Sequence, residues 1–184
     1  MKAANIILIV LFCTSGCVGK QAETNGIAGK ENQGPPPGVL VKNEQGEAVT
    51  NSKEIDGVLY AVYAISKEGL ETMFHEEAAE YDHFSCFYLD IRVKDMADIV
   101  TFPSSTYQTT NDKVHYLSFG IKDYITIETG SKTYKCINST FDRTYGKVPY
   151  SRFFLVFDKV KEQEGVTFKF YDNYFNKGEI NLKL

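Results

Sequence analysis

The strongest constraint on the fold is a period of two in the apolar residues of the C-terminal part of the chain. Between residues 87 and 94, Phe, Leu, Ile and Val alternate with Tyr, Asp, Arg and Lys. Alternation of this kind places the apolar side chains on one face of a strand. Other segments combine β-branched and aromatic residues in short runs between turn signals. We therefore predict strands over residues 58–65, 87–94, 117–121, 125–127, 134–137, 153–157, 166–170 and 180–184.

A series of short strands separated by turns is typical of an antiparallel β-sandwich or barrel. We expect a mostly β domain over residues 55–184, folded as an immunoglobulin-like β-sandwich. The chain contains no tryptophan, so the tryptophan-centred core of antibody domains is not expected. Residues 153–157 are apolar at every position, which predicts a central strand that is buried on both faces.

One short helix is expected in the domain, directly after the first strand. Ser66 is a favourable N-cap residue and Glu68 stands in the first turn. Apolar residues then recur at helical spacing and form one stripe. The residues of this stripe are Leu70, Met73, Phe74, Ala78 and Tyr81.

The N-terminus has the layout of an export signal. Lys2 precedes an apolar stretch over residues 5–12, and residues 14–17 read Thr-Ser-Gly-Cys. This run resembles the lipobox of bacterial lipoproteins. The resemblance implies that the signal peptide 1–16 is removed and that Cys17 becomes a lipidated N-terminus, which holds the protein on a membrane by its acyl chains. Ordinary secretion and an uncleaved membrane helix remain open as alternatives, although no A-x-A-like cleavage site precedes Gln21 and the apolar run is short for a spanning helix.

Residues 17–54 are expected to form a disordered polar tether, because they are rich in Gly, Asn, Gln, Glu and Lys and contain a Pro-Pro-Pro run. Together, the lipobox, the tether and the aromatic β-domain resemble uncharacterised envelope lipoproteins of Bacteroides-type bacteria. That resemblance implies a location in the cell envelope. In Gram-negative lipoproteins, Asp after the lipidated cysteine favours the inner membrane, whereas this chain has Val18. The outer membrane is therefore favoured, on either of its faces.

Two cysteines remain if Cys13 leaves with the signal peptide and Cys17 takes the lipid. These are Cys86 and Cys136. In an oxidising compartment, such a pair is a candidate disulfide. The alternative is two separate buried thiols, which are common in protein cores.

Charge and motif content exclude several classes of function. The net charge is −4 and no basic cluster follows the signal, which argues against nucleic acid as a partner. Residues 75–83 combine His75 and His83 with acidic residues, and Glu76, Glu80 and His83 share one side of a helix. However, Ala79 occupies the position of the second His in an H-E-x-x-H motif. We predict a solvated helix face here, with no metal, no cofactor and no catalytic residue.

The polar connection 138–152 is the best candidate for a partner-binding surface, because long ordered loops often carry function. Its candidate binding residues are Arg143, Tyr145, Tyr150 and Arg152. The alternative is a Greek-key crossover in which Arg143 pairs with a local carboxylate.

The sequence therefore predicts a lipid-anchored, non-catalytic protein-binding or assembly module with a protein partner in the envelope. One alternative is a glycan or small-ligand binder that uses its tyrosine rings as stacking surfaces. The other alternative is a metal-dependent envelope enzyme built on residues 75–83.

Overall fold

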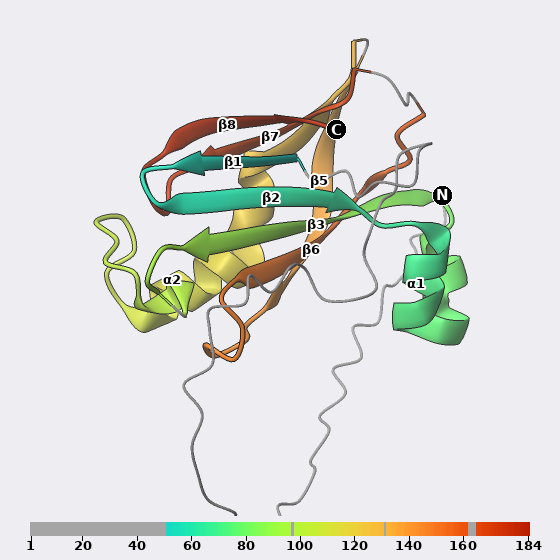
Figure 1. The fold of residues 1–184 in the computed structure, drawn as a ribbon. Helices are drawn as coiled ribbons and strands as arrows, with labels where there is room; N and C mark the ends of the chain where they lie inside the picture. The colour runs from blue at the N-terminus through green and yellow to red at the C-terminus, as the bar shows by residue number, and fades with distance from the viewer. Residues whose placement is uncertain (1–50, 97, 131, 162–164) are drawn as a thin grey trace, which may run out of the picture. The chain divides into compact units, whose positions relative to one another are not determined.

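Eight strands form one antiparallel sheet in the computed structural model, which describes residues 51–96, 98–130, 132–161 and 165–184. The strands are β1 (Asn51–Ile55), β2 (Val58–Ala64), β3 (Phe84–Val93), β4 (Ile125–Glu128), β5 (Thr133–Asp142), β6 (Ser151–Asp158), β7 (Thr167–Asp172) and β8 (Gly178–Lys183). Their order across the sheet is β1-β2-β3-β6-β5-β4-β7-β8 (Figure 1). The predicted signal peptide, the lipidation site Cys17 and the tether up to residue 50 lie outside the described residues.

The sheet curls until its two edge strands lie against each other. β1 and β8 are in contact (Figure 1), and Lys177 Nζ lies 3.1 Å from the Asp56 carboxylate. This ion pair joins the β1–β2 turn to the β7–β8 turn. The result is a nearly closed, barrel-like sheet in which each edge strand shields the other, an arrangement that protects edges from pairing with other chains.

Strand β5 explains why the sheet curls instead of dividing in two. Its first residues pair with β4 and its later residues pair with β6, and the register shifts between Cys136 and Asn138. A bulge of this kind bends a strand and increases its twist, which helps a sheet to close. The structure thus confirms a mostly antiparallel β domain, but it does not confirm the immunoglobulin-like sandwich, because all eight strands belong to one sheet.

The sheet also begins earlier than the sequence pattern indicates. β1 starts at Asn51, inside the segment that we expect to be tether. Its residues are mostly exposed, and Ile55 is the one that packs on the main core, so the strand carries little apolar signal. Asp56 and Gly57 connect it to β2 with positive φ angles of 47° and 77°, as tight hairpins with an Asp-Gly turn require.

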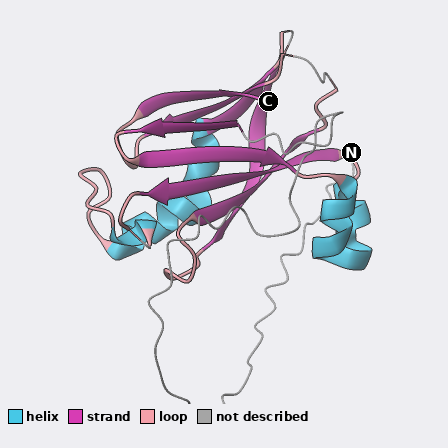
Figure 2. Ribbon diagram, viewed as in Figure 1, coloured by secondary structure: helices cyan, strands magenta, loops and turns pink. Residues whose placement is uncertain are grey.

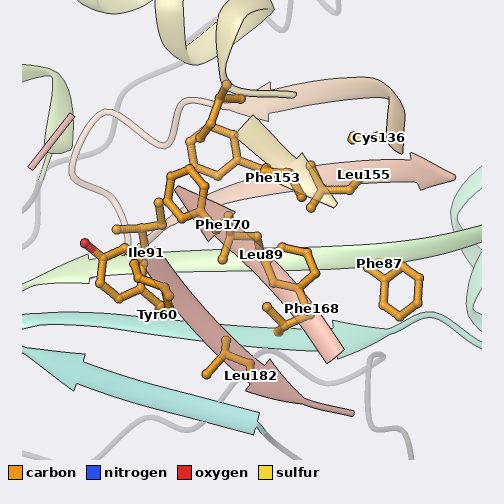
Figure 3. Packing of buried hydrophobic residues seen from close by; sticks show 14 of the residues in the cluster. Tyr60, Phe87, Leu89, Ile91, Cys136, Phe153, Leu155, Phe168, Phe170 and Leu182 are labelled. Atoms are coloured by element: carbon orange, nitrogen blue, oxygen red, sulfur yellow. The ribbon is translucent and has the colours of Figure 1, made fainter. Parts of the chain in front are cut away.

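The interior of the barrel is filled by the apolar faces of its strands. Phe87, Leu89 and Ile91 of β3 point into this core, as the period of two predicts. Phe153 and Leu155 of β6 do the same, and β6 lies between β3 and β5 as the expected central strand. Figure 3 shows these side chains converging with rings from β2 and β7.

Two helical segments flank the sheet (Figure 2). The first is α1 (Lys67–Phe74) with the 3-10 turn η1 (His75–Tyr81), and it confirms the predicted helix. The second runs through α2 (Thr110–His115), the π turn η3 (Tyr116–Gly120) and the 3-10 turn η4 (Ile121–Tyr124). A short 3-10 turn, η2 (Ile99–Thr101), precedes it. None of the helices in the described ranges is long and apolar enough to cross a membrane.

The second helical segment corrects the prediction of a strand over residues 117–121. Leu117 and Ile121 are buried while Phe119 is 64% exposed, so the buried pair has the i, i+4 spacing of a helix. Thr109 starts the segment with a capping box, in which its side chain and that of Asp112 each bond the other's backbone N–H.

Candidate functional site

A cavity of about 330 Å³ opens beside α1 and η1, next to the adjoining ends of β2 and β3. Residues of four segments line it: Ala64, Ile65 and Lys67 from the end of β2 to the start of α1; Leu70, Glu71, His75, Glu76, Ala78, Ala79, Tyr81 and Asp82 along α1, η1 and the residue after it; residues 84–87 of β3; and Lys159 after β6. We call it the helix cavity. Its volume falls at the lower end of the range for small-molecule sites in proteins.

Local sequence explains how the chain wraps around this space. Ser66 caps α1, because its Oγ accepts a hydrogen bond from Gly69 N at 3.2 Å. The α-helix ends at His75, which has a positive φ of 50°. The 3-10 turn that follows reverses the path and brings Asp82 within 3.7 Å of Lys67 at the start of the helix.

The inner wall of the helix cavity belongs to a second apolar cluster on the outer face of the sheet. Ile65, Leu70, Ala78 and Cys86 are all buried in it. Aromatic rings brace the cluster from the side: Phe74, Tyr81 and Phe154 pack on one another with ring centroids 4.7 to 5.7 Å apart. This apolar stripe of α1 and η1 is the one predicted from the sequence.

The rim of the helix cavity is charged. Lys67 and Asp82 form an exposed ion pair, which is worth little in water. Lys159 Nζ donates to the carbonyl oxygens of Asp82 at 3.3 Å and Phe84 at 3.2 Å. The site therefore combines an apolar inner wall with a polar entrance, as many small-ligand sites do.

The structure corrects the candidate disulfide between Cys86 and Cys136. Both are buried free thiols, and they belong to different clusters: Cys86 packs outside the sheet under α1, whereas Cys136 packs inside the barrel. Each pairs with β6 rather than with the other's strand. Two side chains on opposite faces of a sheet point apart, so the bridge cannot form without rebuilding the strands.

We expect both thiols to react slowly with alkylating reagents in the native protein. Burial raises the pKa of Cys86 to about 11 and that of Cys136 to about 12. The reactive thiolate should therefore be at least about 100-fold rarer near pH 8 than in an exposed cysteine. Iodoacetamide labelling followed by peptide mass spectrometry, with and without guanidinium, measures this. A cross-linked peptide containing both residues would contradict it.

The structure does not bring the acidic and histidine residues of 75–83 together at one site. His75 and Glu76 line the helix cavity, whereas Glu80 and His83 do not. All four are exposed. In the described part of the chain, no three His, Cys, Asp or Glu side chains are grouped so that they could hold a metal ion.

The connection 143–150 is a hairpin between the adjacent strands β5 and β6, not a Greek-key crossover. Arg143 pairs with Asp98, at 3.0 Å from Nη2 to Oδ2, and its guanidinium stacks 4.5 Å from the ring centroid of Tyr145. Tyr145 is 70% exposed at the turn. The alternative to partner binding was that Arg143 pairs with a carboxylate of the same chain. It does so, although Asp98 is 45 positions away in the sequence.

Arg152 is buried in an ion pair on the outer face of the sheet. Its Nε and Nη2 donate to the two oxygens of Asp90, each at 2.7 Å. The guanidinium also lies over the rings of Tyr88 at 4.4 Å and Tyr150 at 5.0 Å. Burial disfavours its charge, but the hydrogen bonds and charge of Asp90 outweigh that cost and raise the pKa of Arg152. The guanidinium group of Arg152 is therefore engaged by Asp90 and the two tyrosine rings of the same chain.

The tyrosine rings that a glycan-binding protein would use as stacking surfaces do not share one environment in this fold. Tyr116 and Tyr174 are buried, and Tyr107 stacks on Tyr116 with centroids 4.3 Å apart. Tyr116 and Tyr174 stack in turn at 5.9 Å. By contrast, Tyr171 is 55% exposed. The stacked rings belong to the core, so they are not free surfaces for a sugar.

A buried carboxylate that the sequence did not single out ends β7. Asp172 Oδ2 accepts the hydroxyl of Tyr60, and Oδ1 accepts the backbone N–H groups of Tyr174 at 2.8 Å and Phe175 at 2.9 Å. The Tyr174 hydroxyl continues the network to the Ile99 carbonyl at 2.9 Å. This network joins β2, the β7–β8 turn and η2.

Neither the helix cavity nor the Asp172 network has a local signature, because each assembles residues that are far apart in the chain. Lys159, for example, reaches carbonyls 75 and 77 positions away. Comparisons of the chain with protein-family models, with curated proteins and with solved structures found no match.

Proposed function

We propose that this chain is a lipid-anchored, non-catalytic binding protein of the cell envelope, and that the helix cavity holds a small ligand. The cavity itself is the observation that carries the proposal: about 330 Å³ with an apolar inner wall and a charged rim. Apolar contacts supply most of the affinity at such a site, and a few polar groups orient the ligand.

The cavity supports the proposal better than the hairpin that the sequence favoured for a protein partner. Arg143 and Arg152 both use their guanidinium groups on carboxylates of the same chain. The helix cavity, by contrast, has charged groups at its rim that face solvent. A small ligand is therefore the better-supported partner.

Non-catalytic binding agrees with the chemistry of the cavity wall. The thiol that lines it, Cys86, has its pKa raised by burial, and a protonated thiol is a poor nucleophile. The envelope location rests on the lipobox-like residues before Cys17.

Replacing Cys17 with alanine should release the protein from membranes, because the acyl chains that we propose as its membrane anchor are attached to this residue. Acyl incorporation and membrane fractionation of the full chain measure the effect, with Cys13→Ala as the matched control. Membrane association of the Cys17→Ala variant without any acylation of the wild type would instead favour an uncleaved helix, and acylation lost only in Cys13→Ala would move the lipid to Cys13.

Ligand binding is tested by blocking the cavity entrance. Ala79 is exposed and lines the cavity, so Ala79→Trp should fill the opening without disturbing the core. Thr72→Trp adds the same ring to an exposed position of α1 outside the cavity. Native mass spectrometry of the full chain incubated with an envelope small-molecule extract should show a bound species in the wild type and in Thr72→Trp. Equal binding by Ala79→Trp would count against the proposed site.

A further inference from the structure

We infer that the helix cavity takes a small monoanion with an apolar body, such as a medium-chain carboxylate, and that Lys159 binds its anionic group. This inference rests on the proposed function and names the ligand class of the same site. It depends on the charges at the rim, on the position of Lys159 and on the volume of the cavity.

Lys159 is the cation that the structure holds in place at this site. An ammonium group has three N–H donors, and two of them are used on the carbonyl oxygens of Asp82 and Phe84. Among the described residues it makes no ion pair with a carboxylate. One donor and the full positive charge therefore remain for a ligand, and a preorganised donor loses less entropy on binding.

The positive charge of Lys159 also reaches the inner wall. Burial is the main influence on the Cys86 thiol and raises its pKa, while Lys159 acts in the opposite direction and lowers it. An anionic group beside Lys159 would thus lie next to the apolar wall formed by Leu70, Ala78 and Cys86.

Lys159 differs from the other charged side chains that line the cavity, because its hydrogen bonds to two backbone carbonyl oxygens fix its position. Lys67 and Asp82 pair with each other. Glu71 and Glu76 are exposed on the helical segment, and Lys159 is exposed after β6, so water and salt screen all three charges. His75 is exposed beside them. A cationic ligand would have to place its charge against Lys159, whereas an anionic one gains a charge-assisted hydrogen bond.

The volume limits the size of the apolar body. A cavity of about 330 Å³ lies at the lower end of the range for small-molecule sites, which favours a ligand with a short apolar body. An eight-carbon carboxylate has such a body, which makes octanoate the appropriate probe, with 1-octanol and octylammonium as its neutral and cationic counterparts.

Isothermal titration calorimetry on the full chain with Cys17→Ser, which removes the acyl chains from the assay, tests the inference. Octanoate should bind more tightly than 1-octanol and octylammonium. Lys159→Gln should weaken octanoate binding about tenfold and leave 1-octanol binding unchanged. Lys161→Gln, at an exposed lysine that does not line the cavity, should change neither. Ala79→Trp should abolish the binding of octanoate. Circular dichroism checks that each variant is folded.

Each contrary outcome has a distinct meaning. Unchanged octanoate binding in Lys159→Gln or in Ala79→Trp overturns the inference. If 1-octanol or octylammonium binds more tightly than octanoate and Ala79→Trp abolishes that binding, the ligand class is wrong but the cavity remains a ligand site. If none of the three probes binds to the wild type, the inference fails, and the result with envelope extract then decides the proposed function separately.

Discussion

Replacing Arg152 with alanine is expected to lower the free energy of unfolding by about 3–5 kcal/mol. The substitution leaves Asp90, which is 7% exposed, with a buried charge and no partner. It also removes the planar cation that packs between the rings of Tyr88 and Tyr150. Denaturant titration followed by circular dichroism measures the change, and the loss should be visible as a fall of about 10 °C or more in melting temperature.

The geometry of the pair supplies two controls. Arg152→Lys keeps the charge but cannot donate to both oxygens of Asp90 at once, so we expect an intermediate loss. Arg92→Ala removes an exposed arginine from the same strand as Asp90 and should change the free energy of unfolding by less than about 0.5 kcal/mol. A loss of under about 1 kcal/mol in Arg152→Ala would show that Asp90 is solvated or protonated in the fold.

Most of the strands were predictable because their signal is local. The period of two in β3 places Phe87, Leu89 and Ile91 on the inner face in any antiparallel arrangement. The cap Ser66 and the apolar stripe after it likewise defined α1. The segment 117–121 failed because Leu117 and Ile121 are four residues apart, a spacing that fits both a strand and a helix.

The closure of the sheet and the site were not predictable, because they depend on pairing between distant segments. The alternation in β3 assigns Asp90 to the outer face, but its burial follows from Arg152 directly opposite on β6. The register shift in β5 favours a nearly closed sheet over the expected sandwich. The residue types of β5 do not predict this shift. Four segments of the chain line the helix cavity. The cation among them, Lys159, follows β6, whose apolar sequence predicts a core strand and gives no sign of a binding site.

The second large effect is expected at Asp172, where substitution by alanine should lower the free energy of unfolding by about 3 kcal/mol or more. The carboxylate is 1% exposed and accepts three hydrogen bonds. Its removal leaves the Tyr60 hydroxyl and the backbone N–H groups of Tyr174 and Phe175 without acceptors, and each buried unpaired group costs about 1–3 kcal/mol. Denaturant titration measures the loss. Asp158→Ala, at an exposed aspartate that ends β6, should remain within about 0.5 kcal/mol of the wild type.

Asp172→Asn separates the hydrogen bonds from the charge, because an amide oxygen still accepts the two backbone N–H groups. The loss should therefore be smaller than in the alanine variant. An equal loss in both variants would show that the bond from Tyr60 carries the stability.

The same variant reveals a pH dependence whose sign follows from burial. Burial raises the pKa of Asp172 above its ordinary value, although its hydrogen bonds and Lys177 oppose the shift. The folded state therefore retains this proton to a higher pH than the unfolded chain. Its contribution to the free energy of unfolding is largest below the ordinary pKa and falls as the pH rises through the folded pKa. As the pH rises through this acidic range, the difference in free energy of unfolding between wild type and Asp172→Asn should shrink. A difference that grows as the pH rises would show that the hydrogen bonds to Asp172 outweigh its burial.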